Sequence, residues 1–257
     1  GYAVRINGST NSNTNITVGG TFDTKIDLDG TMGNLILTGS GEKEFRGTPT
    51  VGGNVSIESS CDATCSGTVT INGNLTIASG CSYDTTSAGN HALTVGGNTV
   101  VDGTLNCNGS TIVCTATVSG AGTINFMTSN FTANNNMGCG TLNVGTATID
   151  VADQFGEADE PITATGAATI SCSRMYTSNF TSSTSTVTID VNDDQNIYLA
   201  AGDFYNLIID TNNTKTLSTN ITVRGALTIT SGTLDTGSNR ILTVTGRINI
   251  ANGAVLT

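Results

Sequence analysis

The sequence contains no tryptophan and only 2 prolines, and aromatic residues make up just 5% of its 257 positions. This scarcity excludes a core of bulky aromatic groups, whereas the 37% of hydrophobic residues still supports an ordered interior. The 32 glycines, together with many Thr, Asn and Ser residues, predict frequent tight turns between strand-forming segments. No stretch shows a helical period of useful length. The composition therefore predicts an all-β protein built from thin layers.

Charged residues are also scarce, at 11%, and only nine of them are Lys or Arg, so the net charge is −11. Such scattered basic residues do not form the cluster that phosphates require, and we expect no nucleic-acid partner. No stretch approaches the ~20 apolar residues of a membrane span. The chain opens with GYAVRING, without an initiator Met or a signal peptide. We interpret it as a mature, processed chain, with an excised piece of a longer protein as the alternative.

Seven cysteines in a chain of low charge favour an oxidising, extracellular environment. No pair has CxxC spacing and His91 is the single histidine, which argues against a zinc site. Cys61 and Cys81 are 20 residues apart, so stacked repeats of that length would place them about 4.8 Å apart, within disulfide reach. Cys107 and Cys114 are predicted to face the same interior. These two pairs are therefore the candidate disulfides.

The clearest feature that the sequence does contain is an internal repeat. The stretch 204–229 reads as three short strands separated by turn residues, and it aligns without gaps with 32–57 at an offset of 172. A shorter motif also recurs, in which an apolar residue, any residue and a glycine precede alternating apolar residues. Its steps in the first half are 20, 24 and 23 residues. Clear copies begin at Val51, Ile71, Val95, Val118, Val223 and Val244.

A repeat of this length with two or three short strands has the size of one coil of a β-solenoid. We predict a parallel β-helix-like solenoid, with the glycine of each motif permitting a bend or bulge between strands. Tandem β-sandwich domains are the alternative. One elongated domain is expected over 1–257, in four parts. These are an N-terminal strand and polar linker (1–17), a first repeat array (18–126), an irregular middle with an acidic loop at 152–161 (127–203) and a second array (204–257).

The spaced elements FYNL-I-I, ITV-G-LTITSGTLDTGSN and LTV-G-I-I resemble the β-strand repeats of very large secreted bacterial and archaeal cell-surface proteins. The match covers 186–257 best and 32–124 less closely. The resemblance implies an adhesin-like or filament-forming structural role without catalytic residues. This chain departs from those repeats in its seven cysteines and its short length. Both departures favour a discrete, cross-linked subunit.

Candidate catalytic and metal-binding residues are few. Asp190, Asp193 and Asp194 could bind Ca²⁺ together with backbone carbonyls, because hard cations need clustered oxygens, although the EF-hand glycine and spacing are absent. No other cofactor is expected. A sugar-cleaving β-helix enzyme would need paired carboxylates facing a groove, and the acidic residues here are predicted in loops. We therefore expect no enzymatic activity.

Asparagines in Asn-x-Ser/Thr sequons are frequent. Several lie inside the strand motif, where the asparagine would face outward. In a secreted protein these positions are candidates for glycosylation. The candidates are Asn54, Asn74 and Asn220.

The function that these features favour is an extracellular structural subunit that assembles head-to-tail with copies of itself into a filament or pilus-like fibre. The N-terminal stretch, with Tyr2, Val4 and Ile6 on one face, is the predicted donor strand, and pairing of 1–7 within its own chain is the alternative. The predicted open end includes three apolar residues of the last repeat. They are Ile248, Ile250 and Val255.

Other surface functions stay open as alternatives. One is a cell-surface adhesin or glycan-binding module, whose partners would be glycans or the surfaces of host or neighbouring cells. An S-layer protein fits the composition as well. Ice binding by outward-facing threonines is the third alternative, although the threonines are not in strict register over consecutive copies.

Overall fold

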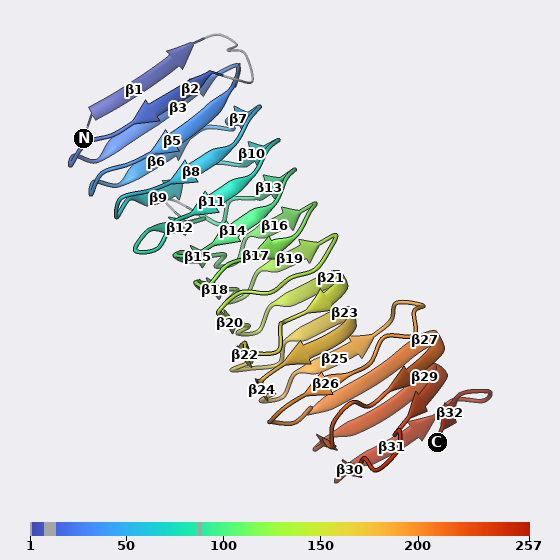
Figure 1. Ribbon diagram of the computed structural model, residues 1–257. Coiled ribbons are helices and arrows are strands. Elements are labelled where there is room, and N and C mark those ends of the chain that lie inside the picture. Colours follow the sequence, from blue (N-terminus) through green and yellow to red (C-terminus); the bar gives the residue numbers. More distant parts are fainter. Residues whose placement is uncertain (1, 8–13, 87–88) are drawn as a thin grey trace. The chain divides into compact units, whose positions relative to one another are not determined.

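The computed structural model describes residues 2–7, 14–86 and 89–257. Within these residues the chain forms no helix, and its parallel strands stack in about 12 turns of a β-solenoid, as can be followed in Figure 1. The predicted fold is confirmed, and the alternative of tandem β-sandwiches is wrong because neighbouring strands pair in parallel. The chain divides into two compact units, Gly1–Ala133 and Asn134–Thr257.

Unit 1 has three parallel sheets, each named here by its first strand. The β1 sheet runs β1 (Tyr2–Asn7), β3 (Thr24–Asp29), β6 (Lys43–Arg46), β9 (Asp62–Cys65), β12 (Ser82–Asp84), β15 (Thr104–Asn106) and β18 (Thr123–Asn125). The β2 sheet runs β2 (Asn15–Val18), β5 (Asn34–Leu37), β8 (Val55–Ile57), β11 (Leu75–Ile77), β14 (Thr99–Val101) and β17 (Val118–Ser119). The β4 sheet runs β4 (Thr31–Met32), β7 (Thr50–Val51), β10 (Val69–Ile71), β13 (Leu93–Val95), β16 (Thr111–Cys114) and β19 (Asn130–Ala133).

Unit 2 uses the same parallel stacking with longer strands. One sheet contains β20 (Thr141–Asn143), β22 (Pro161–Thr163) and β24 (Asn179–Thr181). A second contains β21 (Thr148–Phe155), β23 (Thr169–Thr177), β25 (Thr186–Ile189), β27 (Asn206–Thr216), β29 (Ala226–Asp235) and β31 (Arg247–Ile250). Three further strand pairs complete unit 2. They are β26 (Tyr198–Leu199) with β23, β32 (Val255–Leu256) with β29, and β28 (Ile221–Val223) with β30 (Leu242–Val244).

The core consists of columns of small and medium apolar side chains, one from each coil. In the β4 sheet of unit 1, Val51, Ile71, Val95, Cys114 and Ala133 pair in register from strand to strand, and all are essentially inaccessible to solvent. Strand stacking places successive members about 4.8 Å apart, so a side chain of this size fills its layer. Larger side chains also belong to the core, since Phe45 and Tyr83 are essentially inaccessible to solvent as well.

The motif glycines lie at bends between strands, as predicted, and a second constraint also favours glycine there. Gly73 does not have a left-handed φ. A Cβ atom on it would lie 2.5 Å from Oδ1 of Asn54 and 2.6 Å from the carbonyl oxygen of Gly53 in the preceding coil. Gly53 and Gly97 face the asparagine of the preceding coil in the same way. The close approach of the coils therefore requires glycine at these bends.

The segment predicted as an acidic loop at 152–161 is partly a strand. Residues 152–155 belong to β21, with Phe155 buried, and Pro161 begins β22. Only 156–160 connects the two. The alternation of inward and outward residues in ADQF was hidden by a β-bulge, because the register of β21 against β23 shifts between Val151 and Gln154. The structure contains, in its described residues, no helix long and apolar enough to cross a membrane.

Candidate functional site

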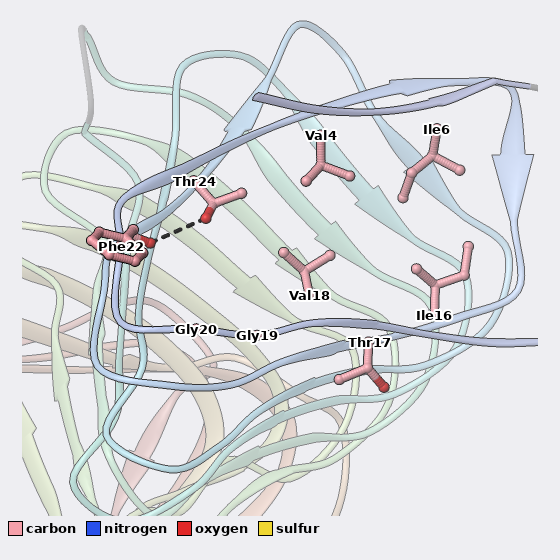
Figure 2. Close-up of a pocket in the computed structure, with 9 residues that line it drawn as sticks. All are labelled: Val4, Ile6, Ile16, Thr17, Val18, Gly19, Gly20, Phe22 and Thr24. Carbon is pink, nitrogen blue, oxygen red and sulfur yellow. Dashed lines mark hydrogen bonds between the residues drawn. The ribbon is translucent and has the colours of Figure 1, made fainter. Parts of the chain in front are cut away.

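The first coil of unit 1 contains an apolar groove of about 400 Å³, here called the β1–β2 groove. Figure 2 shows Val4 and Ile6 of β1 lying across this groove from Ile16 and Val18 of β2, with Phe22 at one side. The lining is completed by Thr17, Gly19, Gly20 and Thr24. Of the four facing aliphatic residues only Val18 is buried, and the other three are half-buried. The groove is therefore an incompletely covered part of the interior.

Strand β1 pairs in parallel with β3 of its own chain, so it is not the unpaired donor strand that the sequence predicted. Val4 lies in register with Ile26, which is fully buried, and Ile6 lies in register with Leu28. The side chain of Tyr2, the third predicted donor residue, lies outside the described residues. The alternative of pairing within the chain is correct. Its physical basis is that β1 satisfies the edge of β3 and covers the Ile26 column.

The groove is open because β1 extends beyond the sheet that faces it. Within the described residues, no strand of the β2 sheet lies beyond β2. Val4 and Ile6 therefore face β2 alone, and no further described strand of the β2 sheet covers their side chains. The sequence of residues 8–13 is Gly-Ser-Thr-Asn-Ser-Asn, which supplies no apolar side chain.

A buried lysine fixes the turn that carries Phe22. Lys43 is fully buried, and its Nζ donates hydrogen bonds to the carbonyl oxygens of Gly41 (2.7 Å), Gly20 (3.2 Å) and Phe22 (3.4 Å). Thr24 Oγ1 donates a further bond of 3.1 Å to the carbonyl of Phe22. Phe22 nevertheless exposes 64% of its surface. A rigid turn thus presents an aromatic ring at the rim of the groove.

The last coil, residues 236–257, leaves its apolar side chains uncovered. Ile248 and Ile250 of β31 lie in register with Leu227 and Ile229 of β29, which are fully buried, but they are themselves 49% and 46% exposed. Val255 of β32 is also exposed. The predicted open-end residues therefore lie together on the last coil. Exposed Ile241, just before β30, was missed because it lies outside the repeat motif.

The groove and the last coil differ in charge. Residues 19–30, from the end of β2 to the end of β3, contain three aspartates and one lysine. Residues 236–257 contain Arg240 and Arg247 and no acidic residue. Opposite signs of charge raise association rates between surfaces and favour one relative orientation.

No disulfide joins any of the seven cysteines, all of which lie in described residues and are buried. The prediction of bridges between Cys61 and Cys81 and between Cys107 and Cys114 is thus corrected. Burial raises the pKa of Cys61 to about 11, against an opposing effect of Lys43, and burial raises the pKa of Cys114 to about 11 as well. Protonated thiols are poor nucleophiles, so these side chains act as small apolar members of the core columns.

The candidate calcium ligands do not converge. Asp190 accepts a hydrogen bond from Ser171 and Asp194 accepts one from Asn213, whereas Asp193 forms an ion pair with buried Lys215. Burial raises the pKa of Asp193, but hydrogen bonds from Lys215 and Ser173 outweigh it and lower that pKa below its usual range. Throughout the described ranges, no three His, Cys, Asp or Glu side chains gather closely enough to hold a metal ion. Each carboxylate has a separate partner, so the structure does not bring the three candidate calcium ligands together.

The sequon asparagines have a structural task. Asn54 and Asn74 are exposed, and the Oδ1 atom of each accepts a backbone N–H of the next coil at 2.8 Å. Asn220 Oδ1 accepts the N–H of Ile241 at 3.0 Å. These bonds engage the carbonyl oxygen of each amide and not its nitrogen. Glycosylation at these positions stays a prediction.

Comparison of the chain with protein-family models, with curated protein sequences and with solved structures finds no match. The function must therefore be inferred from the geometry of the β1–β2 groove and of the last coil.

Proposed function

We propose that the chain is an extracellular structural subunit that assembles head-to-tail with copies of itself into a filament by strand addition. The observation that carries this proposal is the last coil, where Ile248 and Ile250 continue two buried columns and yet remain about half exposed. Burying each of them contributes roughly 1.5–3 kcal/mol at most to an interface. Strand β31 also pairs with β29 alone among the described strands, so one of its edges can accept another strand.

Head-to-tail addition fits the stacking because every strand pair described in the chain is parallel. A strand edge at the β1 side and one at the β31 side differ, so their contact is heterologous. Heterologous contacts that do not close into a ring generate filaments. The large share of Thr, Ser and Asn on the surface and the resemblance to secreted surface repeats support an extracellular location.

The test is assembly measured by light scattering and sedimentation over a range of protein concentrations. Wild-type protein should form species that grow with concentration. Ile248→Asp should remain monomeric, because it places an unpaired carboxylate on the docking face. The matched control is Asn249→Asp, on the opposite, outward face of β31. Equal assembly of both variants, or equal loss, would count against a contact through this face.

Glycan binding is less well supported by the structure. The β1–β2 groove contributes only two hydroxyl side chains, Thr17 and Thr24, and sugars need a dense set of hydrogen-bonding groups. An outward column of Thr31, Thr50, Thr70 and Thr94 is in register, which the sequence did not predict. The column is one residue wide and meets Val113 in the next coil, so it does not form the two-dimensional array that an ice surface requires.

A further inference from the structure

We infer that the β1–β2 groove is the acceptor site for the last coil of another copy, with Ile248 and Ile250 as the anchoring side chains. This inference rests on the proposed head-to-tail function and assigns its two contacting surfaces. It also reverses the direction predicted from the sequence. Strand β1 is the wall of the acceptor and not the strand that is donated.

The groove is lined mainly by apolar side chains. Val4 and Ile6 face Ile16 and Val18 across a space of about 400 Å³, and three of these four side chains are only half-buried. The chain segment that joins the two strands has no apolar residue between Ile6 and Ile16. This connecting segment therefore supplies no apolar cover for the groove.

A strand that covers the groove must have a defined spacing of apolar side chains. Strands β5, β8 and β11 of the β2 sheet each supply two inward apolar residues separated by one outward residue, as Val55 and Ile57 do, and they lie in register from coil to coil. Ile248 and Ile250 have this spacing. They also follow the same motif, since Val244-Thr-Gly-Arg-Ile-Asn-Ile250 matches Val51-Gly-Gly-Asn-Val-Ser-Ile57. The last coil thus carries the side-chain pattern that the groove lacks.

The groove and the last coil also differ in net charge. The last coil contributes Arg240 and Arg247 without any acidic residue, while residues 1–30, which form and border the groove, contain three aspartates against Arg5 and Lys25, a net charge of −1. Asp23 is exposed and Asp27 is half-buried in β3. Two copies approaching groove to last coil therefore bring opposite net charges together, whereas a coil-to-coil encounter opposes like charges. The charges therefore favour contact between the groove of one copy and the last coil of another.

The test uses two variants that each disable one surface. Ile16→Asp changes the groove and leaves the last coil intact, and Ile248→Asp does the reverse. A second groove variant, Ile6→Asp, guards against a local folding defect, and Ala3→Asp on the exposed face of β1 is the matched control. Circular dichroism and thermal melts establish that each variant is folded. Assembly is then followed by analytical ultracentrifugation for each variant alone and for equimolar mixtures.

Each groove variant and Ile248→Asp should be monomeric alone, and Ala3→Asp should assemble like the wild type. Mixing Ile16→Asp with Ile248→Asp should give a 1:1 dimer that grows no further, because the one intact groove binds the one intact last coil and only the two disabled surfaces remain free. Normal filaments from folded Ile16→Asp and Ile6→Asp, with Ile248→Asp still monomeric, would overturn this inference and leave the proposed function standing. Wild-type protein that stays monomeric at all concentrations would overturn both. Assembly of the wild type that is blocked by Ile16→Asp but not rescued in the mixture would also overturn the pairing.

Discussion

Asn54 Oδ1 accepts a hydrogen bond of 2.8 Å from the backbone N–H of Asn74, one coil further along the solenoid. The same bond joins Asn34 to Asn54 and Asn74 to Asn98, so an asparagine ladder runs along the turns of unit 1. Each asparagine side chain occupies the space over the motif glycine of the following coil. Asparagine and glycine in the repeat are therefore a matched pair. Adding a single methyl group to the glycine should therefore lower the stability of the fold.

Gly73→Ala should destabilise the fold by about 1–3 kcal/mol, because the new Cβ would lie 2.5 Å from Asn54 Oδ1 and close to backbone atoms that cannot move independently. The matched control is Gly89→Ala. Among the described residues its Cβ would meet only the ring of His91, at 3.6 Å, and Gly89 does not have a left-handed φ. Urea unfolding of the two variants gives the comparison. Equal midpoints would contradict the ladder.

Lys43→Met should cost about 1–3 kcal/mol of folding stability, because the buried ammonium group holds three carbonyl oxygens that would lose a donor. The turn at Gly20 and Phe22 should loosen as well, which hydrogen exchange can detect. Lys25→Met is the control, since Lys25 is half exposed and its nearest carboxylate, in Glu44, is 3.8 Å away. If the two substitutions had equal effects, the buried lysine would have no special role.

The cysteines should be unreactive in the folded protein and fully reactive in the unfolded one. Burial raises the pKa values of Cys61, Cys107 and Cys114, so few thiolates exist at pH 8 and the reagent cannot reach them. Titration with a thiol reagent without reductant should count no thiols before denaturation and seven after it. A smaller number after denaturation would indicate bridges and would restore the pairing predicted from the sequence.

Stability should fall as pH rises from about 4.5 to about 7 through the titration of Glu160. Burial raises the pKa of this carboxyl to about 7, with a smaller opposing effect from the backbone N–H of Cys139. The folded state therefore keeps a proton that the unfolded state releases, so the contribution is complete below pH 4.5 and lost above pH 7. Its size is on the order of 2 kcal/mol. Urea midpoints across this pH range measure it.

Glu160→Gln should remove this part of the pH dependence, whereas Asp159→Asn, at an exposed neighbouring position, should retain it. An unchanged slope in Glu160→Gln would mean that another group is responsible.

The repeat in the sequence predicted the fold because each coil repeats the same physical tasks. The offset of 172 pairs Asn34 with Asn206, and each of these side chains accepts a backbone N–H of the next coil. It also pairs Lys43 with Lys215, and both lysines are fully buried. The predicted inward positions Val223 and Leu227 are buried as well. Periodic residues were therefore reliable guides to the interior.

The sequence could not predict features that depend on which strands meet. The β1–β2 groove exists because β1 pairs with β3 across a polar connection, and nothing in the order of residues indicates that pairing. Strand β27 runs through Thr216, past the turn residues Asn212 and Asn213, because it follows β29 with shifts of register. The polar residues at these positions suggested separate short strands. Tertiary pairing outweighed their local preference.

The most direct test of self-assembly is electron microscopy of the purified wild-type protein in negative stain, over a range of concentrations. The account predicts unbranched fibres that lengthen with concentration and that are absent from Ile248→Asp at the same concentrations. Separate particles of single-chain size at every concentration of the wild type would contradict it.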